Sequence, residues 1–185
     1  MLYFGSKQNN TGLFSIRSSG RIGIVIGPVI NPHNLHIDGF YCKTHNGQYN
    51  GIVVDIDVRD LSAKGIVIDN HEDISEPAEL VRLKSIIDIN YQLIGKPVYS
   101  GKSKVGKVID YVFDVKSLFI TALHVQPSLL KSFGTNQLII DRQSIIEVSD
   151  SRITISSPDQ KELSSLRQKF SPASLKSAST SAISE

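Results

Sequence analysis

The chain lacks the features that identify several common classes of protein. It has one cysteine among 185 residues, Cys42, so no internal disulfide can form, and a single free thiol is typical of a reducing compartment. No apolar run approaches the roughly 18 residues that span a bilayer. The first residues also lack the basic and then apolar pattern of a signal peptide. We therefore expect a cytoplasmic protein with no transmembrane segment, whose membrane contacts would be peripheral or through a partner.

A strong net charge and the common catalytic motifs are missing too. The formal net charge of +2 is too small to indicate nucleic-acid binding by itself. The sequence has no Gly-x-Ser-x-Gly elbow and no His-Glu-x-x-His helix. Gly101-Lys102-Ser103 resembles the end of a phosphate-binding loop, but the upstream glycine, Gly95, is one residue too distant. We therefore expect a protein that is not an enzyme and that needs no cofactor or metal.

What the chain does contain is an internal duplication. Residues 22–42 align without a gap with residues 105–125, 83 positions later, and six of the 21 aligned pairs are identical. Gly23/Gly106 is one of these pairs. Such self-similarity indicates that one small structural unit is used twice. Units of about 65 residues are marginally stable alone, so we expect the two to pack on each other or on a partner.

Short runs of Val, Ile and Phe between Gly, Asn and Pro predict strands throughout both units. In the first unit we expect strands over residues 12–17, 21–30, 35–43, 52–54 and 65–69. The second unit begins at residues 93–99, and a lysine-rich hairpin at 100–104 and the repeated strands follow. We then expect a short helical or irregular excursion over 127–133 and strands over 137–141, 144–148 and 152–156.

The closing strands of the two units can be aligned in two registers. Residues 57–68 align with residues 144–155, whereas residues 85–89 match 144–148 more closely letter by letter. We favour the first register because only it continues through a turn into a second strand.

Between the units the sequence predicts an amphipathic connecting helix. Ser75 is a suitable N-cap, Pro77 would lie in the first turn, and Leu80, Leu83 and Ile87 would fall on one face. A strand followed by a short helix is the alternative. After residue 157 the chain becomes rich in serine, which is typical of a flexible tail with at most a short helix. The predicted divisions are a first unit, a helical linker, a second unit and a tail, over residues 1–70, 71–92, 93–157 and 158–185.

Three segments of the second unit carry a family resemblance: residues 93–98, 105–114 and 120–125. They resemble the PRC-barrel family, named after the cytoplasmic domain of the photosynthetic reaction-centre H subunit. The first unit resembles a second, more divergent copy. The resemblance implies two small β-barrels with a binding or assembly role. Gly23 and Gly106 lie inside the expected strands, where glycine marks the bend or close backbone approach that a small barrel needs.

Four lysines of the second unit have no acidic residue among them: Lys96, Lys102, Lys104 and Lys107. They form a candidate patch for an anionic partner such as RNA phosphate, an acidic protein or lipid headgroups. Solvated lysines that protect a sheet edge are the alternative. One branch of the PRC-barrel family is similar to ribosome maturation factors. The Gly-rich basic opening of that branch has only a faint counterpart in residues 19–23.

One cluster of residue types would suit zinc: His33, His36, Asp38, Cys42 and His45. Its spacing differs from that of a zinc knuckle, and the aligned positions of the second unit lack ligands, so we expect a polar turn followed by a strand. Asp55, Asp57 and Asp60, with Arg59, form an acidic loop, which we interpret as an exposed strand edge. The sequence therefore predicts a non-enzymatic adaptor or assembly protein that binds a protein partner. An RNA-binding or ribosome-maturation role is the alternative.

Overall fold

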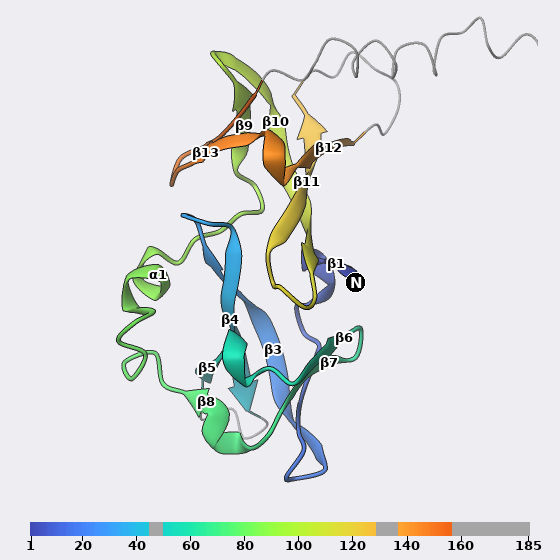
Figure 1. Ribbon diagram of the computed structural model, residues 1–185, viewed down its shortest axis with the longest axis vertical. Helices are drawn as coiled ribbons and strands as arrows, with labels where there is room; N and C mark the ends of the chain where they lie inside the picture. Colours follow the sequence, from blue (N-terminus) through green and yellow to red (C-terminus); the bar gives the residue numbers. More distant parts are fainter. Residues whose placement is uncertain (45–49, 129–136, 157–185) are drawn as a thin grey trace, which may run out of the picture.

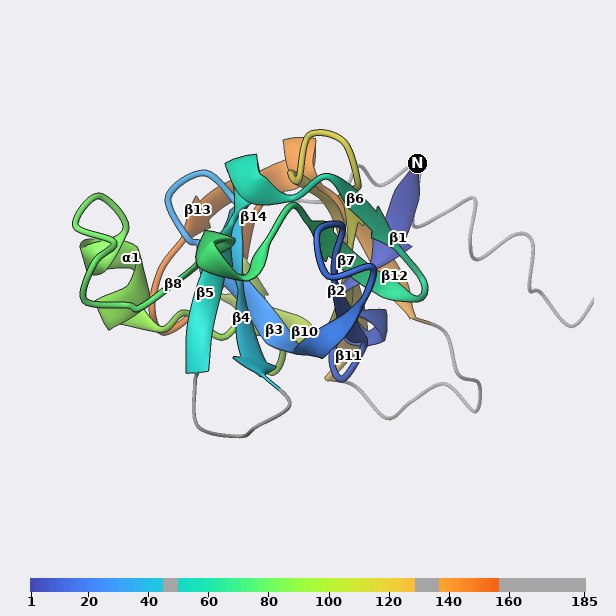
Figure 2. The same ribbon diagram turned by 90° about the horizontal axis from the view of Figure 1, so that it is seen from below.

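The computed structural model describes residues 1–44, 50–128 and 137–156. These residues form mainly β-strands, arranged in curled sheets that include a half-barrel (Figure 1 and Figure 2). The predicted mostly β fold is confirmed. Two predicted features lie outside the described residues: the flexible tail over 158–185 and most of the excursion over 127–133. No helix of the described segments is long and apolar enough to cross a membrane.

Strands between residues 12 and 75 build one seven-stranded sheet. Its strands, in spatial order, are β6 (Asp60–Ser62), β7 (Gly65–Ile68), β2 (Gly12–Ser15), β3 (Gly20–Asn31), β4 (His36–Thr44), β5 (Asn50–Val54) and β8 (Ile74–Ser75). β2 and β7 run parallel, and the other neighbours are antiparallel.

The second sheet repeats this order. Its strands are β13 (Ile145–Val148), β14 (Ile153–Ile155), β9 (Pro97–Ser100), β10 (Ser103–Asp114), β11 (Ile120–Pro127) and β12 (Leu138–Asp141), with β1 (Leu2–Phe4) added alongside β10. β14 and β9 again form the parallel pair. The duplication of the sequence is therefore a duplication of topology, from which only β1 and β8 depart.

The two long hairpins match in detail. The pairing of β3 with β4 shifts register twice, and the pairing of β10 with β11 shifts at positions 83 residues later. These irregularities bend the strands and increase their twist, which curls each sheet. A 3-10 turn precedes β6 and another precedes β13: η2 (Asp55–Asp57) and η4 (Arg142–Ser144). This correspondence supports the alignment of residues 57–68 with 144–155, because residues 85–89 lie in a helix instead.

Gly23 and Gly106 occupy equivalent positions where two backbones approach closely. A Cβ at Gly23 would lie 2.4 Å from the carbonyl oxygen of Lys43, and one at Gly106 would lie 2.1 Å from that of Gln126. Both distances are far shorter than a van der Waals contact, so a side chain at either position would push the paired strands apart.

The hairpins of the two repeats lie side by side and point in opposite directions (Figure 1). At their tips, the Ile37 N–H donates to the Leu118 carbonyl at 3.0 Å, and the Ile120 N–H donates to the Leu35 carbonyl at 2.9 Å. Each of these residues is equivalent to its counterpart 83 positions away. The reciprocal pair of bonds therefore relates the repeats by an approximate two-fold axis, as in an isologous dimer.

Both tips hold a leucine in the left-handed region, Leu35 and Leu118, each with φ of 54°. This conformation is unfavourable for a residue with a branched side chain. Both side chains are buried in the core that the two repeats share, and both carbonyls accept the inter-repeat bonds. Burial and hydrogen bonding across the junction offset the local strain.

The segment between the sheets is less helical than the sequence predicts. Ser75 belongs to β8, where it pairs with Ile52 of β5, and α1 covers only Lys84–Ile89. The continuous helix from Ser75 is therefore wrong, and the alternative of a strand followed by a short helix describes the chain better. The residues that would continue the helix close short turns instead, with bonds from the Glu79 N–H to the Glu76 carbonyl at 2.9 Å and from the Val81 N–H to the Glu79 carbonyl at 3.0 Å. Ile86 then packs on Val29 and Ile52, on the outer side of the first sheet.

The two repeats are also interlocked through their leading segments. β1 precedes the first sheet in sequence but pairs with β10 of the second, and α1 precedes the second sheet but packs on β3 of the first. One buried core runs through both repeats. The expectation that the small units pack on each other is met by exchange of these segments as well as by the hairpin tips.

Candidate functional site

Three of the four predicted patch lysines are exposed, whereas the fourth is engaged within the protein. Lys102, Lys104 and Lys107 lie on or near the β9–β10 hairpin. The Lys96 ammonium lies 4.7 Å from the centre of the Tyr91 ring and donates to the Asp150 carbonyl. Lys96 therefore supports the fold around Tyr91.

A further basic residue, Arg152, joins the exposed lysines. Its guanidinium lies 5.8 Å from the centre of the Tyr99 ring, and Lys104 is the cross-strand partner of Tyr99. The parallel pairing of β14 with β9 brings Arg152 close to Tyr99. Because the two residues are far apart in the sequence, the sequence alone did not indicate that Arg152 belongs to this patch.

Among the described residues suggested as zinc ligands, His36 and Asp38 meet, but Cys42 does not join them. Cys42 is buried at 1% exposure, and its thiol donates to the Phe40 carbonyl at 3.3 Å. Burial raises the pKa of this thiol to about 12, so the thiolate that binds metals is disfavoured. His45 lies outside the described residues. Among residues 1–44, 50–128 and 137–156, no group of three or more His, Cys, Asp or Glu side chains could hold a metal ion.

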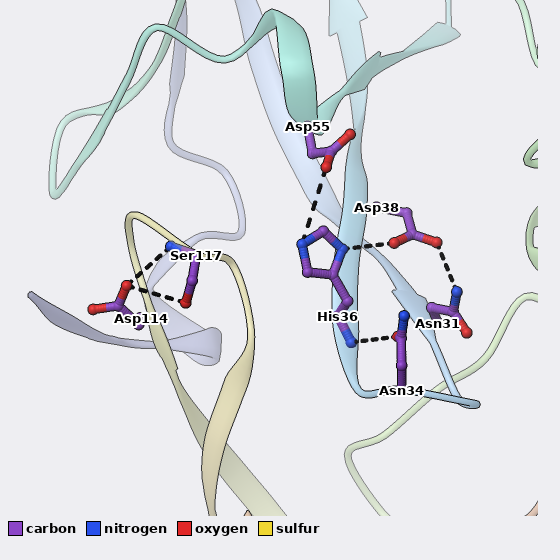
Figure 3. Close-up of polar contacts among 7 residues, drawn as sticks. All are labelled: Asn31, Asn34, His36, Asp38, Asp55, Asp114 and Ser117. Atoms are coloured by element: carbon purple, nitrogen blue, oxygen red, sulfur yellow. Dashed lines mark hydrogen bonds and ion pairs between the residues drawn. The ribbon is translucent and has the colours of Figure 1, made fainter.

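His36 and Asp38 from the same sequence cluster instead form part of a polar group at the start of β4 (Figure 3). The Nδ1 atom of His36 lies 2.7 Å from Oδ1 of Asp38, and its Nε2 atom lies 4.0 Å from Oδ2 of Asp55. The Asn31 amide donates to the second oxygen of Asp38 at 2.9 Å. Asn34 accepts from the His36 N–H at 2.9 Å and so fixes the turn before the strand. The imidazole is therefore held between two carboxylates.

This group continues across the junction into the second repeat. The rings of His36 and Phe119 meet edge to face with centroids 4.6 Å apart, and the Arg142 guanidinium lies 4.7 Å from the Phe119 centroid. Asp55, His36, Phe119 and Arg142 thus form a row of side chains. The row joins the repeats through aromatic and cation–π contacts. These contacts explain the arrangement of the four side chains without a catalytic role.

Ser117 lies on the neighbouring hairpin in Figure 3, and its polar groups bond within the turn of that hairpin. Its N–H and hydroxyl both donate to Oδ1 of Asp114, at 2.9 and 3.2 Å. The hydroxyl is therefore directed at Asp114 and away from the His36 imidazole, so the nucleophile–base contact of a hydrolase is not formed between them.

Beside this row, a groove of about 480 Å³ separates η2 from the turns that follow β8. Its lining residues are Val54, Asp55, Ile56, Glu79, Leu80, Val81, Arg82 and Leu83. Ile56 is 75% exposed and Val81 is 79% exposed. Two large apolar side chains thus border one hollow. In the sequence the only signal was an isoleucine within an acidic loop.

The η2 side of the groove is acidic. Burial raises the pKa of Asp57, and so does repulsion from Asp73, Asp55 and Asp69. The nearby cation, Arg59, is bound to Asp69 through Nη2 and Nε at 2.7 and 2.8 Å. Negative charge at η2 is therefore only partly neutralised.

Comparisons with known proteins add no function to this geometry. No protein-family model matches the chain, and a search of curated proteins finds no relative.

Proposed function

We propose that the protein is a non-enzymatic adaptor of the cytoplasm, built from two PRC-type barrel units, that binds a protein partner. The observation that carries this proposal is the groove bordered by Ile56 and Val81. Exposed apolar side chains around one hollow are typical of surfaces that another protein covers.

The composition of the interior supports a binding role. Of the buried side chains in the described residues, only Gln8 and Ser15 are polar; the others come almost entirely from aliphatic and aromatic residues. The interior of the two sheets is therefore used for packing. Chemistry or recognition is left to the surface, where the groove lies beside the junction of the repeats.

The groove lies between η2 of the first repeat and the segment that links the repeats. Asp55 contributes both to its lining and to the row of side chains at the junction. A partner in the groove would contact η2 and residues 79–83 together. An adaptor with this arrangement presents its second repeat to a further partner, and the two binding events then reinforce each other through effective concentration.

The test is affinity purification with a matched pair of variants. Ile56→Asp/Val81→Asp places charges at the groove, and Ile16→Asp/Ile139→Asp places them at two exposed apolar side chains elsewhere. We expect a partner that is retained by the wild type and by the control but lost by the groove variant. Equal recovery with both variants would remove the groove from the proposal, and recovery of no specific partner would remove the adaptor role.

RNA binding is a second candidate because Lys104 and Arg152 flank Tyr99 on the second repeat, and Lys102 is exposed in the adjoining hairpin turn. Cations supply phosphate contacts, and an accessible aromatic ring can stack on a base. Lys102→Ala/Lys104→Ala should then weaken RNA binding and reduce its salt dependence, whereas Lys43→Ala/Lys64→Ala on the first repeat should not. Binding that is absent at low salt would exclude this candidate.

A further inference from the structure

We infer that the groove between η2 and residues 79–83 receives a short peptide segment of the partner, with apolar residues flanked by lysine or arginine. This inference rests on the proposed adaptor function and specifies the partner's chemistry.

The size and shape of the groove favour a short segment. A hollow of about 480 Å³ accommodates a few side chains, whereas two flat domain faces meet over a much wider area. Val54, Leu80 and Leu83 line the hollow and are partly buried, while Ile56 and Val81 border it and are exposed. Apolar side chains of the segment would complete the burial of this surface.

The floor of the groove is held in place, which limits the ordering cost of binding. Leu80 packs against the cluster of Val29, Ile52 and Ile86 on the outer side of the first sheet. The Glu79 carboxylate accepts from the Glu76 N–H at 3.0 Å and closes the turn before the lining residues. A surface that is already shaped in the free protein loses less entropy when a ligand binds.

The charge around the groove selects the flanks of the segment. Asp55 and Glu79 line it. Asp57, which is also in η2, is within electrostatic range of both Asp55 and Asp73. The lining includes a single cation, Arg82. Lysine or arginine beside the apolar residues would neutralise the excess carboxylates, whereas acidic flanks would be repelled.

The test uses bead-bound peptides with a randomised core of Leu, Ile, Val, Phe and Met. The core is flanked on both sides by Lys-Lys, by Ser-Ser or by Glu-Glu. The full chain is applied in its wild-type form and as Ile56→Asp/Val81→Asp, and binding that the groove variant loses is counted. We expect the lysine-flanked beads to bind about three- to tenfold better than the serine-flanked beads at about 50 mM NaCl, and the difference to shrink at about 500 mM.

Charge variants separate this inference from general attraction to a protein. Asp55→Asn/Glu79→Gln should abolish the excess of lysine-flanked over serine-flanked binding, and this ratio is read whatever effect the two changes have on overall binding. Asp60→Asn/Asp141→Asn changes two exposed carboxylates outside the groove lining and should retain the preference. A preference that survives the first pair, or that is absent in the wild type, overturns the inference.

The remaining outcomes also decide between occupants. If binding depends on the groove but favours serine or glutamate flanks, the inference that the segment has basic flanks is wrong. The adaptor proposal is then unaffected. Sedimentation can show that the wild type self-associates. If Ile56→Asp/Val81→Asp abolishes that self-association, the groove binds a second copy of the chain and the inference is overturned. Lysine-flanked peptides could bind the groove although no cellular partner depends on it. That result would support the inference about the chemistry of the groove and contradict the adaptor function.

Discussion

His36 and Phe119 occupy equivalent positions in the two repeats and face each other across the approximate two-fold axis, with ring centroids 4.6 Å apart. Their surroundings have diverged in charge. His36 has Asp55 as its neighbour, whereas Phe119 has Arg142, and these two neighbours begin the equivalent turns η2 and η4. One position of the duplicated unit has thus become acidic on one side of the axis and basic on the other. The asymmetry gives the junction a unique pairing that identical repeats would lack.

The first prediction concerns this junction. Phe119→Ala removes the contacts of the ring with His36 and Arg142, so we expect the free energy of unfolding to fall by about 1–2 kcal/mol. Urea denaturation measures the change. Ile139→Ala, which truncates a 65% exposed side chain, is the matched control and should cost much less. A double-mutant cycle with Arg142→Ala isolates the cation–π contact, and a coupling energy near zero would contradict its role.

The hairpins were predictable because their information is local and occurs twice. The sequence predicted strands over 21–30 and 35–43, and the structure has β3 (Gly20–Asn31) and β4 (His36–Thr44). β1 was not predicted, since three residues carry too little periodicity and its partner strand β10 lies more than a hundred residues away. In the linker, the helix-start pattern at Ser75 is followed by turns, and the helix begins only at Lys84.

The candidate site was predictable in its parts but not in its arrangement. His36 and Asp38 were noticed as metal-ligand types and Asp55 as part of an acidic loop. Curling of the sheet from β4 to η2 brings Asp55 close to His36, and the two-fold packing adds Phe119 and Arg142. Neither contact has a signal in sequence spacing. The groove depends in addition on the turns that replace the expected helix over residues 76–83.

A second prediction tests the close backbone approach at Gly106. Gly106→Ala would place a Cβ 2.1 Å from the Gln126 carbonyl oxygen, so β10 and β11 must separate, at a cost of about 1–3 kcal/mol or more. The control is Gly27→Ala, because its Cβ would lie 3.5 Å from the nearest atom, Oδ1 of Asn9, which is an ordinary contact. Chemical denaturation of both variants gives the comparison. Equal stability of the two would show that the strands adjust without cost.

A third prediction follows from the buried thiol of Cys42. Its pKa is raised by burial to about 12, while the thiol of the unfolded chain ionises near its ordinary value of about 9. Above that value the unfolded chain binds fewer protons than the folded chain, so stability falls as the pH rises from about 9 toward 12. Cys42→Ala removes this contribution, and its free energy of unfolding should decline less between about pH 8 and about pH 10.5.

Reaction with a thiol reagent provides an independent measurement on the same residue. Native wild-type protein should react with iodoacetamide only as fast as it opens, because Cys42 is 1% exposed and its thiolate is disfavoured. Addition of denaturant should raise the rate to that of a free thiol. Rapid labelling of the native protein at about pH 8 would contradict the burial of this side chain.

The last prediction concerns Asp114, which fastens the N-terminus to the second repeat. Its carboxylate accepts from the Ser117 N–H at 2.9 Å, from the terminal amine of Met1 at 2.9 Å and from the Lys116 N–H at 3.0 Å. These bonds hold the pKa of Asp114 below its ordinary value, with the Ser117 N–H as the largest cause. Because the folded pKa is lowered, the stabilisation is present above about pH 4 and is lost as the pH falls through the folded pKa.

Asp114→Asn should therefore be less stable than the wild type near neutral pH, with a difference that narrows as the pH falls below about 4. Urea unfolding of both proteins across this range measures the difference, with Asp60→Asn as the control at an exposed carboxylate. The variant should also exchange the Val115 N–H more rapidly, since this group donates to the Met1 carbonyl at 2.8 Å and reports on β1. A difference that stays constant with pH would mean that the turn geometry alone, and not the charge of Asp114, holds β1 against β10.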